Sequence, residues 1–262
     1  MVFKKLMQAM GVGGPSVETV LSNPNCRPGG VLEGQIHVMG GDHDVDIEYV
    51  ALGLVTRVEV ESGDSEYETT QEFHRKQATG AFRLARGQRY DIPFRFEVPW
   101  ETPITEVYGQ HLHGMTMGLR TELEVARAVD KGDLDAVAVH PLPAQEQILQ
   151  ALVRLGFRFS RADVERGRIY GVHQTLPFYQ EIEFYPAPQY ARALNQLELT
   201  FLATPQHLQV VLEIDKRGGV FTEGHDAFGR FTVDYNTVGQ VDWAAQLDGW
   251  LRQSIQKRGL FF

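Results

Sequence analysis

The sequence predicts an all-β protein built from two β-sandwich halves. Apolar side chains alternate with polar ones along many short segments, and this is the period of a strand that buries one face. Glycine and proline separate the segments at short intervals, as they do between the strands of antiparallel sheets. The strand-like segments do not alternate with long helical ones, so a doubly wound nucleotide-binding fold is not expected.

The stretch 26–61 shows the alternation most clearly and organises the first half. It opens with a turn at residues 27–30, where proline and two glycines meet. Two strands follow, whose predicted buried faces are Leu32, Gly34, Ile36 and Val38 in the first and Val50, Leu52, Leu54, Val58 and Val60 in the second. Arg57, Glu59 and Glu61 alternate with the second set and are expected to face water.

The remainder of the first half continues as strands. The clearest runs over 92–98, and Pro93 within it predicts an edge strand or a bulge because proline lacks a backbone N–H. The other expected elements are a loop and an edge strand within 63–80, a short strand at 82–84, a strand over 119–129, a turn at 130–133 and a strand over 134–139.

A proline pair at residues 141–143 predicts the linker between two domains, 1–140 and 141–262. A helix is expected after it, with an apolar stripe over 148–153 and a C-terminal cap at Gly156. Asp242 is expected to cap a final helix. The strands expected between these helices lie at 182–184, 197–201, 208–214 and 231–235.

The first residues predict a short amphipathic helix rather than a signal peptide, because lysines interrupt the apolar run and no cleavage site follows. Its apolar side chains are Phe3, Leu6, Met7 and Met10, at helical spacing. This stripe could pack on its own domain, on a partner or second subunit, or on a membrane surface. Packing on its own domain or on a second subunit is favoured, since two lysines are a weak attraction for lipid.

Composition limits the possible functions. The chain has 262 residues and a formal charge of −9, which disfavours binding to nucleic acid. No apolar run reaches the length that crosses a bilayer. A single cysteine, Cys26, cannot form an intramolecular disulfide, and this fits a reducing compartment.

Few residue patterns suggest chemistry, and neither a cofactor nor an enzymatic activity is predicted. His111 and His113 are two residues apart, which on a strand would place both rings on one face for zinc, yet no third ligand lies nearby. The acidic run 42–46 fits a solvated turn better than a cation loop. Glu181 and Glu183 would share a face like the carboxylates of a glycosidase, but alternation on a solvent face is preferred.

Several motifs resemble those of known proteins. RPGGVLEG at 27–34 and DIPFRFEVP at 91–99 resemble strand motifs of arrestin-fold proteins. FKKL at 3–6, ALVRLGF at 151–157 and LPFYQEIEFYP at 176–186 resemble the bacterial sporulation-control (SpoOM) family. The resemblance covers nearly the whole chain. It implies two arrestin-like β-sandwich domains with short helices at the N-terminus, the linker and the C-terminus. It also implies a cytoplasmic location and a regulatory role at the start of sporulation.

Two functions are therefore compared. The preferred one is a non-enzymatic regulator or scaffold that contacts other proteins. This function leaves open a homodimer and peripheral contact with a membrane. The alternative is a metal-dependent enzyme or a ligand-binding module that uses His111 and His113. The identity of the partner stays open.

Overall fold

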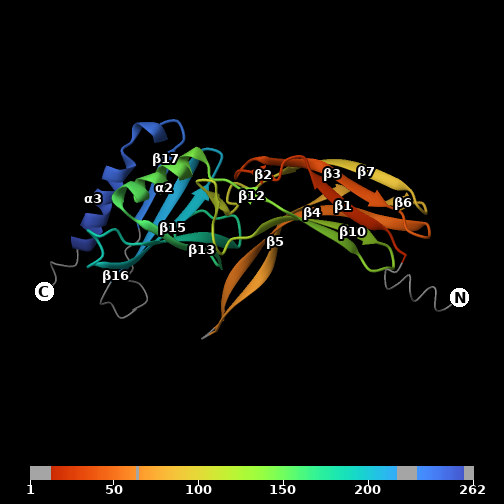
Figure 1. The fold of residues 1–262 in the computed structure, drawn as a ribbon, viewed down its shortest axis with the longest axis horizontal. Coiled ribbons are helices and arrows are strands. Elements are labelled where there is room, and N and C mark those ends of the chain that lie inside the picture. Colours follow the sequence, from red (N-terminus) through yellow and green to blue (C-terminus); the bar gives the residue numbers. More distant parts are fainter. Residues whose placement is uncertain (1–12, 63–64, 217–228, 257–262) are drawn as a thin grey trace. The chain divides into compact units, whose positions relative to one another are not determined.

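The computed structural model describes residues 13–62, 65–216 and 229–256, and strands dominate them, which confirms the all-β prediction (Figure 1). The chain forms two compact units. Unit 1 comprises Met1–Arg57, Thr70–Pro99 and Thr116–Val139, and unit 2 comprises Val58–Thr69, Trp100–Met115 and His140–Phe262. The domain bounds expected from the linker, 1–140 and 141–262, stay a prediction.

Unit 1 is a sandwich of two sheets. Its strands are β1 (Ser16–Leu21), β2 (Asn25–Cys26), β3 (Val31–Met39), β4 (Val45–Ser62), β5 (Ser65–Thr79), β6 (Phe82–Leu84), β7 (Arg89–Glu97), β10 (Met117–Val125), β11 (Lys131–Ala136) and β12 (Ala138–Val139). One sheet has the order β1-β3-β7, and the other has the order β11-β10-β4 with β5 and β6 also paired to β4. The far ends of β4 and β5 belong to unit 2.

The core of unit 1 lies between these sheets. Leu32, Ile36 and Val38 of β3 are fully buried, as their alternation predicts. The predicted face of β4 is also buried at Val50, Leu52 and Leu54. In the part of β4 that belongs to unit 2, Val58 is buried and Val60 is half-buried. A buried hydrogen bond of 2.6 Å between the hydroxyl groups of Thr19 in β1 and Thr121 in β10 joins the two sheets.

Pro93 occupies the position that its chemistry demands. It lies in β7, opposite Gln35 of β3, and β7 is an edge of its three-stranded sheet. The missing N–H of proline therefore interrupts no ladder between two neighbouring strands. The prediction of an edge strand at 92–98 is confirmed.

Unit 2 contains an antiparallel sheet and two helices. Its elements are β8 (Glu106–Val107), β9 (Gln110–His111), α2 (Pro143–Leu155), β13 (Arg158–Arg166), β14 (Phe178–Tyr185), β15 (Leu194–Ala203), β16 (His207–Lys216), β17 (Gly229–Asp234), the 3-10 turn η1 (Val238–Gln240) and α3 (Trp243–Gln256). The strand order is β13-β14-β15-β16-β17, and the end of β4 pairs in parallel with β13 at Glu59 and Glu165.

The two helix caps that the sequence predicts, Gly156 and Asp242, are present in the structure. Pro143 opens α2, and the backbone N–H of Leu142 donates to Gln145 Oε1 over 2.7 Å. Gly156 ends the helix in the left-handed conformation, with φ 93°. Asp242 Oδ1 accepts a hydrogen bond of 3.2 Å from the N–H of Ala245 in α3. Among the described helices, none has the length and apolarity that crossing a bilayer requires.

The sheet of unit 2 has two unlike faces. One face is apolar and fully or almost fully buried; its members are Val164, Ile182, Phe184, Leu197, Leu199, Leu212 and Ile214. Helix α3 packs on this side, since Trp243 stacks on Phe231 of β17 with ring centroids 5.6 Å apart. The register of the strands collects carboxylates on the other face, and this face holds the candidate site.

Several expectations differ from the structure. Strands β1, β2, β8, β9 and β13 were not expected. The strand over 119–129 ends at Val125, and the predicted turn at 130–133 falls mostly inside β11, because the chain already turns near Arg127, whose φ is 61°. The strand over 134–139 is divided between β11 and β12. The predicted N-terminal helix lies outside the described residues.

Candidate functional site

His111 and His113, the predicted zinc candidates, do not come together with a third ligand among the described residues. The two ring nitrogens of His111 lie 2.8 Å from Glu106 Oε1 and 3.0 Å from the carbonyl oxygen of Met115. His113 is exposed in the turn that follows β9. Metal binding by this pair stays a prediction.

Two other predicted features are the N-terminal apolar stripe and the acidic run 42–46. Phe3, Leu6, Met7 and Met10 lie outside the described residues, so their interface role stays a prediction. In the acidic run 42–46, Asp44 and Asp46 pair with Arg83 over 3.3 and 3.2 Å at the surface. This arrangement agrees with the expected solvated turn.

The carboxylates of unit 2 form a continuous row across its sheet, here called the acidic row. Antiparallel pairing places Asp163 of β13 opposite Glu181 of β14. It also places Glu183 opposite Glu198 of β15, and Glu198 opposite Glu213 of β16. Directly opposed residues share a face of the sheet, so the side chains of these residues project to the same side. The row is Glu59, Asp163, Glu165, Glu181, Glu183, Glu198 and Glu213.

Asp163, Glu165 and Glu181 form the centre of the acidic row. One carboxylate oxygen from each lies within 4.8 Å of the others. Asp163 is only 6% exposed, and neither of its oxygens has a hydrogen-bond partner. Glu181 and Glu165 are half-buried. Like charges so close and so poorly hydrated favour a bound proton or a bound cation.

The pKa values of these three carboxyl groups are all raised, as this crowding predicts. Burial raises the pKa of Glu181 to about 9, and the carboxylates of Glu198 and Asp163 act in the same direction. Burial also raises the pKa of Glu165 to about 7 and the pKa of Asp163 to about 6. The prediction that Glu181 and Glu183 lie on a solvent face was therefore wrong, because Glu181 is half-buried and Glu183 is only 4% exposed.

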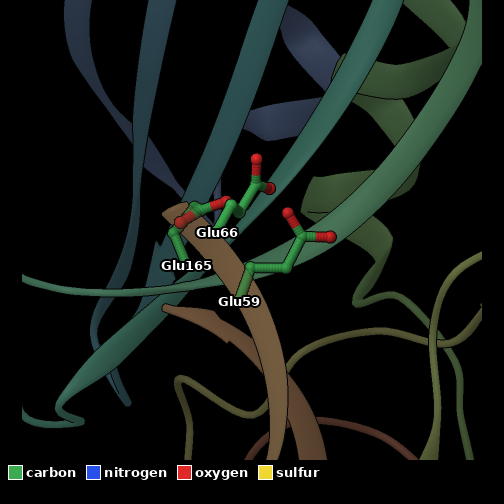
Figure 2. Close-up of side chains that lie close together, drawn as sticks. All are labelled: Glu59, Glu66 and Glu165. Carbon is green, nitrogen blue, oxygen red and sulfur yellow. The ribbon is translucent and has the colours of Figure 1, made fainter. Parts of the chain in front are cut away.

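The row continues to the tip of the β4–β5 hairpin. Figure 2 shows the side chains of Glu59, Glu66 and Glu165 gathered where β4 lies beside β13, and their carboxylate oxygens lie within 4.8 Å of one another. A hydrogen bond with Glu66, together with burial, raises the pKa of Glu59 to about 7. The expectation that Glu59 faces water was wrong, since its Oε2 atom is buried without a hydrogen-bond partner.

Arg161 stands at the rim of the acidic row. Its Nε donates a hydrogen bond of 2.7 Å to Glu183 Oε1 and lies 3.5 Å from Asp163 Oδ2. The side chain of Arg161 is 56% exposed. The guanidinium therefore compensates Glu183 well, but it leaves Asp163 with a long contact and no hydrogen bond.

A cavity of about 270 Å³ opens on the same face next to Glu181. Glu198 and Glu213 line it on one side, and Arg168 and Arg230 supply positive charge. Such a lining suits a small polar or charged ligand better than an apolar one.

Sequence reasoning missed this site for a specific reason. It noted Glu181 and Glu183 as a pair but assigned them to solvent, and it did not predict β13. The segment of β13, RFSRADVER, has only a short apolar alternation at Ala162 and Val164, and Phe159 is out of phase with it. The available signal was alternation of charged residues at 161, 163 and 165, which reads equally well as an exposed loop.

Cys26 lies in β2 and is buried, with an exposed fraction of 8%. Burial raises the pKa of its thiol to about 12. Because only the thiolate reacts, alkylation by iodoacetamide at pH 8 is expected to be roughly a thousandfold slower in the folded protein than in urea. Mass spectrometry of the alkylated fraction over time measures this difference. Equal rates in both states would contradict the burial of Cys26.

Comparison with known proteins identifies the relatives of this chain. The family described as SpoOM protein matches residues 3–218. The sporulation-control protein spo0M of Bacillus subtilis (strain 168) is 35% identical over 216 residues, which cover 82% of this chain and 81% of that protein. The crystal structure of Spo0M, sporulation control protein, from Bacillus subtilis, superposes with a TM-score of 0.81 at 29% identity and covers 92% of this chain and 99% of that chain.

Proposed function

This chain belongs to the SpoOM protein family, and on that basis we propose that it is a non-enzymatic regulatory protein that acts through protein–protein contacts in the control of sporulation. The observation that carries the proposal is the similarity to a sporulation-control protein along most of both chains. The proposal includes a cytoplasmic location, which the use of a single cysteine supports.

The outer edge of β5 is the contact surface in this proposal. Within the described strands, β5 pairs with β4 and with no other. Residues 65–68 at its start are exposed, and Tyr67 has an exposed fraction of 52%. The open edge of a strand can accept an extended segment of another protein through backbone hydrogen bonds, and an exposed tyrosine adds apolar contact.

A charge placed on this edge tests the proposal. Tagged full-length protein is purified from its native cytoplasm, and mass spectrometry determines the co-purified chains and the native mass. Tyr67→Lys is expected to reduce recovery of a recurrent partner by roughly tenfold, as loss of an aromatic anchor does at interfaces. Tyr185→Lys is the matched control, because Tyr185 lies on β14 and its exposed fraction of 53% is close to that of Tyr67.

Each outcome has a clear meaning. A recurrent partner lost only with Tyr67→Lys supports both the adaptor function and the edge of β5. A dimer lost in the same way identifies a second copy of the chain as the occupant. A monomer without partners in all three preparations contradicts the proposed function, and equal recovery with Tyr67→Lys contradicts the choice of surface.

The alternative function, a metal-dependent enzyme or ligand-binding module at His111 and His113, has its own test. A metal would have to replace the contacts of His111 with Glu106 and Met115. Zinc analysis of the purified protein decides the matter. About one zinc per chain, lost on His111→Ala, would support this function, and a zinc-free protein would contradict it.

A further inference from the structure

We propose that Asp163, Glu165 and Glu181 form a binding site for one calcium ion on the sheet of unit 2. The inference concerns a ligand of this chain and goes beyond the proposed regulatory contacts. It is tested without any partner protein, so either proposal can fail while the other stands.

The spacing of the three carboxylates suits calcium. One oxygen from each lies within 4.8 Å of the others, a separation that one calcium ion can bridge with calcium–oxygen distances of roughly 2.3–2.6 Å. Oxygen is the donor that hard cations prefer, and calcium tolerates irregular geometry. Magnesium requires shorter bonds, near 2.1 Å, and a nearly ideal octahedron, so it is expected to bind more weakly.

Asp163 supplies the second, independent observation. It is 6% exposed, yet neither carboxylate oxygen has a hydrogen-bond partner. Arg161 Nε is 3.5 Å from Oδ2 and is already committed to Glu183 at 2.7 Å. A buried carboxylate without hydrogen bonds is costly, because the water it has lost is not replaced. A cation held between Asp163, Glu165 and Glu181 would replace that hydration.

Neighbouring carboxylates add negative charge around the three ligands, and an adjoining cavity gives access to them. Glu165 is shared with the group formed by Glu59 and Glu66, as Figure 2 shows, and Glu181 is shared with the group formed by Glu198 and Glu213. These neighbours increase the negative potential at the site. The cavity of about 270 Å³ beside Glu181 offers a hydrated ion a route to the carboxylates.

Calorimetric titration of calcium chloride into the full-length protein, after treatment with EDTA, tests the proposal. About one calcium ion per chain is expected, with a Kd of roughly 10–100 µM, in the range between sensor and extracellular sites. Asp163→Asn is expected to weaken binding by at least about tenfold, since it removes one charged ligand. Glu124→Gln is the matched control, because Glu124 belongs to a separate acidic group with Glu122 and Asp130 in unit 1.

The controls keep the test decisive. Asp163→Asn removes a buried charge, so circular dichroism is expected to show a folded protein in EDTA; Glu165→Gln serves as the second variant if it does not. Absence of binding at 1 mM calcium, about ten times the weakest Kd expected, would overturn the proposal. Unchanged affinity in Asp163→Asn and Glu165→Gln, or equal loss in Glu124→Gln, would also overturn it.

Discussion

Replacing Glu181 by glutamine is expected to stabilise the protein in EDTA by on the order of 3 kcal/mol at pH 8. In the folded chain Glu181 either keeps a proton or buries a charge beside other carboxylates, and burial is the main reason that its pKa is raised to about 9. In the unfolded chain the same group ionises freely in water. Glutamine has the size of the protonated side chain and avoids both costs.

The sign follows from proton linkage. Between the ordinary pKa of 4.5 and the folded value of about 9, the folded state holds a proton that the unfolded state has released. The free energy of unfolding therefore falls as pH rises through this window. The gain from Glu181→Gln is expected to be near zero at pH 4 and largest near pH 9.

Urea unfolding at pH 4, 6, 8 and 9, which together span this window, measures the effect. Glu48→Gln is the control, because Glu48 is exposed on β4. A stability of Glu181→Gln that follows the wild-type pH profile in parallel would contradict the burial of a strained carboxylate at this position.

Replacing Gly34 by alanine is expected to destabilise the protein by about 3 kcal/mol or more, because the added methyl group overpacks a closed interior. Gly34 is buried in β3 between β1 and β7. A Cβ atom there would collide with the backbone oxygen of Val20 and would stand 2.9 Å from two ring carbons of Phe94. Neither a strand backbone nor a half-buried ring can move freely.

Gly80 provides the matched control for this prediction. It is exposed, and a Cβ atom built on it would have no heavy atom within 4 Å. Gly80→Ala is therefore expected to change stability by less than about 0.5 kcal/mol. Thermal and urea unfolding of both variants compare the two positions. Similar stabilities for Gly34→Ala and Gly80→Ala would show that the sheet can open at Gly34.

Local patterns predicted the elements whose environment is simple. In β3 one face is core and the other is solvent, so alternation alone located Leu32, Ile36 and Val38. The caps of α2 and α3 depend on neighbours within a few residues, and both were correctly predicted from Gly156 and Asp242. Pro93 indicated an edge strand because a residue without an N–H cannot donate a hydrogen bond to a second neighbouring strand.

The rule that alternation separates a core face from a solvent face failed at the acidic row. It assumes that the charged face of a strand meets water, and this holds for an isolated amphipathic strand. In unit 2, however, Glu59, Glu181 and Glu183 come from strands β4 and β14, and other acidic strands adjoin them. Their register brings carboxylates together and removes much of their water.

The sequence by itself determined most of the strands that have an apolar face, the helix caps at Gly156 and Asp242, and the family that the chain resembles. These properties depend on side chains that are close along the chain. Only the tertiary structure decided that Asp163, Glu165 and Glu181 meet, because their contact depends on the pairing of β13 with β14. The charge and burial of such a cluster are properties of several strands together, and so no single segment can reveal them.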